Sequence, residues 1–196
     1  MHRPATRLAV IAGIALSLTA APVFASTFKI GNYGQFHFAD YDDFDTGFGL
    51  AGSYMFTPEI RGFAEFTGVD NSDFELDRFV LGGGYTLIEQ DIFQLELGGS
   101  FQNWDVTQPV PGTGDTTSED DNALGVFANT QFEVTREVVL GARAEYINFD
   151  DFGSDFGIGG NADIQVTDEL SLFADVMFWR DDIDQTFLTL GARYNF

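Results

Sequence analysis

Apolar and polar residues alternate at a period of two along most of the chain after residue 26. Such a period is typical of strands whose two faces meet different surroundings. In the last segment Leu188, Leu190 and Ala192 fall on one face, whereas Thr189, Gly191 and Arg193 fall on the other. The pattern predicts ten strands, with eight as the alternative if two segments are loops. The ten run over about 28–38, 46–56, 60–69, 76–88, 92–104, 122–134, 138–148, 156–166, 170–180 and 185–196.

The predicted connections are of two kinds, which alternate along the chain. Four are tight turns, at 57–59, 89–91, 135–137 and 167–169; five are longer loops, at 39–45, 70–75, 105–121, 149–155 and 181–184. Outer-membrane barrels have this layout, with short periplasmic turns and longer outer loops. Most predicted strands also have about the 9–11 residues that a tilted strand needs to cross a bilayer.

The two faces of these strands favour a membrane barrel over a soluble sandwich. One face carries bulky apolar residues, as at Phe79, Leu81 and Phe178, and the other carries charges in mid-strand, as at Arg143 and Glu145. A dry sandwich core would hardly tolerate such charges. In lipid every backbone amide needs a partner, which closure of the sheet provides. We therefore expect an all-β fold, a closed antiparallel transmembrane β-barrel.

The N-terminal segment has the layout of a secretory signal peptide. Arg3 and Arg7 give a basic start, an uncharged apolar run extends from Leu8 to Ala21, and the small residue Ala25 ends the segment. The run is shorter than the roughly 20 residues of a membrane helix. We expect residues 1–25 to be cleaved, although an uncleaved anchor is the alternative. Residues 26–196 would then form the barrel domain, exported through the periplasm to the outer membrane of a Gram-negative cell.

The final residues carry a resemblance to a known group of proteins. The segment from Gly191 to Phe196, with alternating apolar residues and a terminal Phe, resembles the C-terminal strand of small proteobacterial outer-membrane barrels, the OmpA-like and OmpX/Ail-like proteins. The resemblance implies that Tyr194 and Phe196 are recognised by the barrel-assembly machinery. It also implies contact with outer-membrane lipids and lipopolysaccharide. It indicates a fold and a location rather than an activity, and ten strands depart from the eight usual in this group.

Charge excludes some partners and predicts a polar lumen. Residues 26–196 keep seven of the nine basic residues and all 31 acidic ones, a formal charge of −24, which argues against nucleic acid as a partner. By strand parity, five basic and six acidic residues point into the lumen, where arginines should pair with carboxylates. This predicted lumen network comprises Lys29, Arg61, Glu65, Arg78, Glu96, Glu133, Arg143, Glu145, Asp163, Asp175 and Arg193.

This lumen has two interpretations. It is either a salt-bridged plug that stabilises a closed barrel or a narrow charge-lined pore that passes ions or small solutes. Lumen glycines such as Gly84 and Gly98 would leave room for water, or they would ease strand coiling. Trp104 and Trp179 have lumen parity at the outer strand ends, where we expect them to cap the lumen rather than line a ligand site. Large porin trimers have more strands, so we expect a monomer.

The acidic loops suggest an alternative function as a surface-interaction barrel that binds cations, lipopolysaccharide or another cell. Clustered carboxylates can bind Ca²⁺, and the candidate ligands are Asp40, Asp42, Asp43, Asp45, Glu119, Asp120 and Asp121. Neither cluster matches a calcium-loop pattern, so a solvated acidic crown is the favoured interpretation, with no metal or cofactor. We expect no enzyme, because His37 is the one histidine after residue 25 and no catalytic motif accompanies it.

Overall fold

The computed structural model describes residues 31–41, 46–70, 75–109, 116–151, 153–181 and 185–196. The predicted signal peptide, Lys29, and the calcium candidates Asp42, Asp43 and Asp45 lie outside these ranges. None of the described residues belongs to a helix long and apolar enough to cross a membrane.

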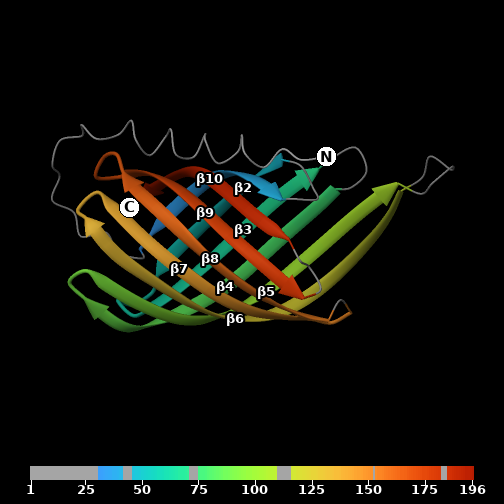
Figure 1. Ribbon diagram of the computed structural model, residues 1–196, viewed down its shortest axis with the longest axis horizontal. Coiled ribbons are helices and arrows are strands. Elements are labelled where there is room, and N and C mark those ends of the chain that lie inside the picture. Colours follow the sequence, from blue (N-terminus) through green and yellow to red (C-terminus); the bar gives the residue numbers. More distant parts are fainter. Residues whose placement is uncertain (1–30, 42–45, 71–74, 110–115, 152, 182–184) are drawn as a thin grey trace.

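Ten antiparallel strands form a closed barrel, which confirms the predicted fold class and the count of ten (Figure 1). Each strand pairs with its sequence neighbours, and β1 pairs with β10 to close the sheet. The strands are β1 Tyr33–Tyr41, β2 Thr46–Met55, β3 Ile60–Asp70, β4 Glu75–Gln90, β5 Phe93–Pro109, β6 Thr116–Thr135, β7 Val138–Phe149, β8 Ser154–Gln165, β9 Leu170–Asp181 and β10 Thr186–Asn195.

The predicted loop at 105–121 is wrong for most of its length. β5 and β6 continue as a paired hairpin from Asp105 opposite Asp120 to Pro109 opposite Thr116. Threonine and valine are β-branched and favour extended backbone, so this segment forms strand despite its acidic residues. Pro109 ends β5, a position that strands tolerate. The hairpin projects beyond the other strands at the loop end of the barrel (Figure 1). The candidates Glu119, Asp120 and Asp121 therefore lie on β6 rather than in a loop.

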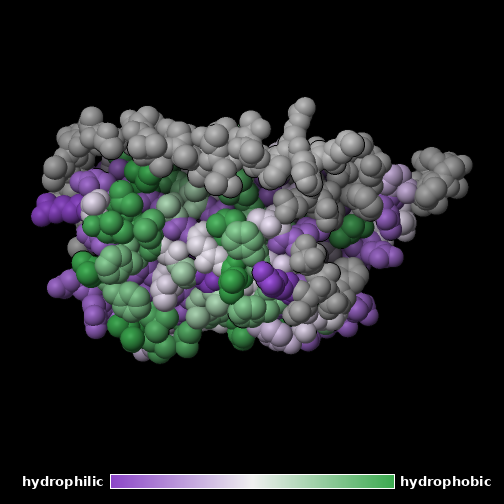
Figure 2. All heavy atoms as spheres, in the orientation of Figure 1, coloured by the Kyte–Doolittle hydropathy of each residue, from purple (hydrophilic) through white to green (hydrophobic). Residues whose placement is uncertain are grey.

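The two faces of the wall differ as the alternation predicts. Large apolar side chains such as Phe38, Leu50 and Leu124 are exposed on the outside. Figure 2 shows hydrophobic residues gathered over the middle of the barrel, with hydrophilic residues towards its two ends. Charged side chains such as Glu96, Glu145 and Asp163 are buried on the inner face. An apolar exterior around a charged interior is the inverse of a soluble domain and suits a lipid surrounding.

Three of the four short turns share the sequence Thr-x-Glu, at 57–59, 135–137 and 167–169. The threonine Oγ1 accepts a hydrogen bond from the backbone N–H of the glutamate in each turn, at 3.2–3.3 Å. Side-chain acceptors of this kind hold the backbone in a tight turn. The repeated motif explains why the connections between strands are short at this end of the barrel.

Candidate functional site in the barrel lumen

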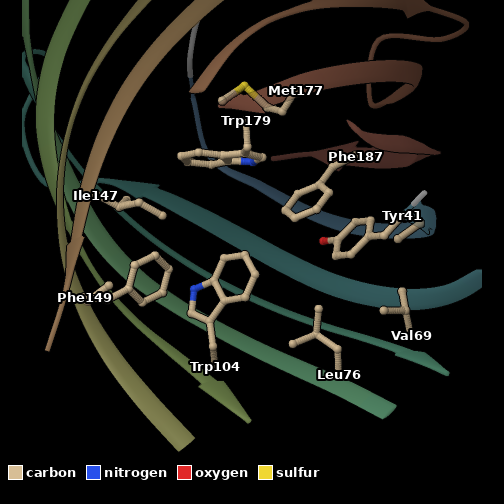
Figure 3. Close-up of a cluster of buried hydrophobic side chains, with 11 residues drawn as sticks. Tyr41, Val69, Leu76, Trp104, Ile147, Phe149, Met177, Trp179 and Phe187 are labelled. Atoms are coloured by element: carbon tan, nitrogen blue, oxygen red, sulfur yellow. The ribbon is translucent and has the colours of Figure 1, made fainter. Parts of the chain in front are cut away.

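An apolar cluster fills the lumen at the loop end of the barrel, and we call it the outer cluster. Its side chains come from eight different strands and lie within the wall (Figure 3). Its members are Ala39, Tyr41, Val69, Leu76, Trp104, Ala123, Ile147, Phe149, Met177, Trp179 and Phe187. All of these side chains are buried.

Phe187 joins the aromatic part of the outer cluster. Its ring stacks on Tyr41 with 3.8 Å between centroids and lies 5.9 Å from Trp104 and 6.3 Å from Trp179. Trp104 also meets Phe149 edge to face at 5.6 Å. Rings from β1, β5, β7, β9 and β10 thus meet across the lumen. Trp104 and Trp179 both lie in the outer cluster, the position that their predicted role of capping the lumen requires.

A polar network centred on Gln102 lies next to the outer cluster. Gln102 is fully buried, and its Oε1 accepts hydrogen bonds from Arg78 Nε and Nη2 and from Trp104 Nε1 at 3.0–3.2 Å. Its Nε2 donates to Glu145 Oε1 at 2.9 Å and to Ser100 Oγ. A buried amide with all its groups satisfied orients its neighbours. Sequence reasoning missed Gln102, although its lumen parity was visible.

Four arginine ion pairs lie in the described part of the lumen, and two of them share Arg78 or Glu145 with this network. Arg61 and Glu96 form a bidentate ion pair, in which Arg61 Nε donates to Glu96 Oε1 at 3.0 Å and Nη2 donates to Oε2 at 2.9 Å. Both side chains are buried. Arg143 meets Glu145 at 2.9 Å. Arg193 donates to Asp163 and also to Gln35 across the β1–β10 seam. The fourth pair, Arg78 with Glu65, is longer at 3.7 Å.

Each of these guanidinium groups also lies over an aromatic ring. Arg61 is 4.8 Å from the Phe63 centroid, Arg78 is 5.1 Å from Trp104, and Arg143 is 4.9 Å from Phe127. Arg193 lies between Tyr33 and Phe173, at 4.2 and 5.0 Å. Guanidinium planes stack well on rings. The arginines are therefore fixed on two sides, by a carboxylate and by a ring.

The structure does not pair every acid of the predicted network. Within the described part of the chain, Asp175 forms neither an ion pair nor a hydrogen bond, although it lines the lumen cavity. Glu133 is half-buried near the end of β6 and has no ion pair to a described residue. Among the described residues, Asp175 and Glu133 are therefore the two acids of the predicted network that form no ion pair.

At several lumen glycines the missing side chain makes room for a neighbouring side chain. A Cβ added at Gly84 would lie 1.6 Å from Glu96 Oε1, and one at Gly82 would lie 2.4 Å from Phe63. Gly84 lies opposite Arg61 on the adjacent strand β3. The Glu96 side chain from β5 therefore crosses the inner face of β4 at Gly84 and meets Arg61 of β3 there. On the outer face, Gly34 has nothing within 4 Å of the same position.

A cavity of about 170 Å³ remains in the lumen. It reaches from Asn195 and Gln131 near the short turns to Trp179 and Phe187 of the outer cluster. A cavity needs about 10–15 Å³ to hold one water molecule, so this one has room for several. The lumen is thus polar and roomy below the outer cluster and apolar within it.

The other candidate residues that the structure describes are His37, Asp40, Glu119, Asp120 and Asp121. His37 is buried, with Nε2 3.0 Å from Thr67 Oγ1 and Nδ1 3.3 Å from Gln35 Nε2. Asp40 lies in β1, Glu119 and Asp120 are exposed, and the buried Asp121 accepts a hydrogen bond from the Asp151 backbone. No group of three or more His, Cys, Asp or Glu among the described residues is arranged to hold a metal ion.

The C-terminal strand lies where its alternation predicts. Tyr194 and Phe196 are exposed on the outer face. The Phe196 backbone N–H donates to the Asn32 carbonyl at 3.1 Å, which extends the seam between the last strand and the first. The terminal residues therefore take part in barrel closure.

Comparison of the sequence with protein families gives no match, and no curated protein is similar to it. Solved structures are similar in fold. The Escherichia coli outer-membrane protease OmpT has a TM-score of 0.52 and 14% identity, covering 85% of this chain and 94% of that chain. The translocator domain of the Neisseria meningitidis autotransporter NalP has a TM-score of 0.50, 10% identity and coverage of 97% and 95%. The NanC porin has a TM-score of 0.50, 6% identity and coverage of 85% and 100%.

These three proteins are a protease, a translocator domain and a porin, so the likeness extends to the fold and leaves the activity open. What the chain shares with them is the closed antiparallel β-barrel of outer-membrane proteins.

Proposed function

We propose that this chain is a small, non-enzymatic outer-membrane β-barrel whose lumen is closed at the outer end. Its apolar exterior, its charged interior and its fold support a place in the membrane. The predicted signal peptide supports export through the periplasm. The proposed partners are outer-membrane lipids and lipopolysaccharide, with the barrel-assembly machinery recognising Tyr194 and Phe196, and the proposed state is a monomer.

The proposal that the lumen is closed rests on one observation. The stacked and tilted rings of the outer cluster extend across the lumen. Passage of a hydrated ion past Phe187 would require its contacts with Tyr41, Trp104 and Trp179 to separate. Below it, the arginines are fixed by carboxylates and rings. The barrel is therefore a plug-like structural element that conducts at most through rare openings of this cluster.

Conductance of the purified barrel in planar lipid bilayers tests this function. We expect wild-type protein to be silent for most of the recording, and Phe187→Ala to give frequent discrete openings. Phe178→Ala is a matched control, since Phe178 lies on the outer face close to the same end. Steady conductance of the wild type, unchanged by Phe187→Ala, would show that the outer cluster does not close the lumen.

A second candidate function, interaction at the cell surface, is favoured by the projecting β5–β6 hairpin. Asp77, Asp105 and Asp120 lie directly opposite one another on β4, β5 and β6. Like charges in such cross-strand positions repel, and a field of this sign attracts a diffuse layer of cations or a basic partner. Replacing Asp77, Asp105 and Asp120 together by asparagine should abolish attachment to such a partner and leave conductance unchanged. If attachment survives the triple substitution, these carboxylates are not the surface involved.

A further inference from the structure

The charges of the lumen cavity do not cancel at the end beneath the outer cluster. Glu96, Glu145 and Asp163 are each held by an arginine, and their side chains are at most 1% exposed. Counted by pairs, that leaves Arg78 for both Glu65 and Asp175, which line the cavity with it, and Arg143 and Arg193 also act on Asp175. Arg78 directs two of its nitrogens to the neutral Gln102, and its contact with Glu65 is long at 3.7 Å. The uncompensated charge in this part of the cavity is therefore negative.

Aromatic rings lie next to this negative region. Asp175 pairs with Thr189 across β9 and β10, and the next inward-facing pair towards the outer cluster is Met177 with Phe187. Tyr41 lies opposite Phe187 on β1, and both rings line the cavity together with Trp179. No described guanidinium lies over these three rings, whereas Tyr33, Phe63 and Phe173 are already covered by arginines. Tyr41 and Phe187 cover one face of each other, and the ring surface that they and Trp179 turn to the cavity attracts cations through its quadrupole.

The approach to the cavity is also acidic. The cavity reaches the level of the short turns. The turns at 57–59, 89–91, 135–137 and 167–169 carry six acidic residues and one basic residue, Arg136; the acids are Glu59, Glu89, Asp91, Glu137, Asp168 and Glu169. A rim of one charge sign concentrates ions of the opposite sign in an adjoining low-dielectric space.

From these three features we propose that the lumen cavity binds a monovalent organic ammonium ion, which enters from the short-turn end. Its charge lies at Asp175 and Glu65, and its alkyl groups contact Tyr41, Phe187 and Met177. A metal ion fits less well, because the cavity offers two carboxylates among apolar rings rather than a full set of oxygen ligands. The proposal does not require the lumen to conduct, so a silent barrel in bilayers leaves it intact.

The tryptophans of this chain make the test direct. The sequence has two, Trp104 and Trp179, and both lie in the outer cluster at the end of the cavity. Choline serves as the probe, and its uncharged isostere dimethylbutanol has almost the same shape. Titration of the folded barrel in detergent with choline should change the tryptophan emission to saturation, whereas dimethylbutanol at equal concentrations should not. In Trp104→Phe the change should persist, because Trp179 lines the cavity.

Two carboxylate variants distinguish binding at the cavity from general attraction by the acidic chain. Asp175→Asn keeps the side-chain volume and should weaken the apparent choline affinity by about tenfold or more, since it removes a charge beside the ion. Asp168→Asn removes an exposed charge in a short turn and should change the affinity by less than about twofold. Circular dichroism of each variant verifies folding. Equal weakening by both variants, no saturable change with choline, or equal responses to choline and dimethylbutanol would each overturn the proposal.

Discussion

The outer cluster and the ion-paired section of the lumen occupy neighbouring levels of one barrel, yet they are stabilised differently. The outer cluster is held by burial of apolar area, which has no preferred direction and tolerates changes of shape. The ion-paired section is held by directed contacts such as Arg61–Glu96, where each charge depends on a partner at a fixed place. A volume-conserving change of shape should therefore cost little in the outer cluster, whereas loss of one charged group should cost much in the ion-paired section.

The largest effect should come from removing one charge of a buried pair. Glu96→Ala leaves the Arg61 guanidinium buried without its carboxylate, and we expect a loss of about 3–5 kcal/mol in the free energy of unfolding. Urea unfolding of the barrel in lipid vesicles measures this loss. The double variant Arg61→Leu/Glu96→Leu should recover much of it, because no charge is then left unpaired. A loss below about 1 kcal/mol for Glu96→Ala would show that water reaches the pair and screens it.

An intermediate effect should come from filling a lumen glycine. A Cβ at Gly98 would lie 2.2 Å from Phe127 Cζ and 2.3 Å from the Gly83 carbonyl oxygen. We expect Gly98→Ala to destabilise the barrel by about 1–3 kcal/mol through overpacking. The adjacent Gly99 faces outward with its nearest contact at 3.4 Å, so Gly99→Ala should stay within about 0.5 kcal/mol. Similar losses for the two variants in urea unfolding would contradict the difference between the faces.

The smallest effect should come from a change of shape within the outer cluster. Leu76 is buried at 1% exposure among apolar neighbours. Leu76→Met conserves volume and should cost less than about 1.5 kcal/mol. The same unfolding assay measures it, with bilayer conductance as a second readout that should stay silent. A loss as large as that of Glu96→Ala would mean that the outer cluster is as directional as the ion pairs.

The sequence alone predicts the wall of this barrel well, because strand alternation is a local property. Parity alone places Arg61, Glu96 and Arg143 inside and Phe38 and Leu124 outside, and the structure agrees. Tight turns are also local, so seven of the ten strands, β2 to β4 and β7 to β10, begin and end within two residues of their predicted limits. β1 is shifted by three to five residues, and β5 and β6 are longer than predicted, since the acidic residues and proline of their hairpin outweighed its β-branched residues in the prediction.

Contacts inside the lumen could not be predicted, because they depend on the register between strands distant in sequence. The stacking of Arg193 between Tyr33 and Phe173 joins β10, β1 and β9. The meeting of Arg61 and Glu96 depends on Gly84, a residue of the strand between them. Strand parity predicts which face of the wall a side chain lies on. It does not predict the position of that side chain along the barrel axis relative to residues of other strands. The unpaired Asp175 escaped prediction for the same reason.

The seam between β1 and β10 has a consequence for the order of folding. Gln35 and Arg193, which are hydrogen-bonded there, lie 158 positions apart, and the stacked Tyr41 and Phe187 belong to the same two strands. Contacts between such distant segments are entropically the slowest to form, so the hairpins should assemble first and the seam should close last. Interactions formed that late act mainly on the rate of unfolding. The contacts between β1 and β10 would thus determine how slowly the folded barrel opens and unfolds.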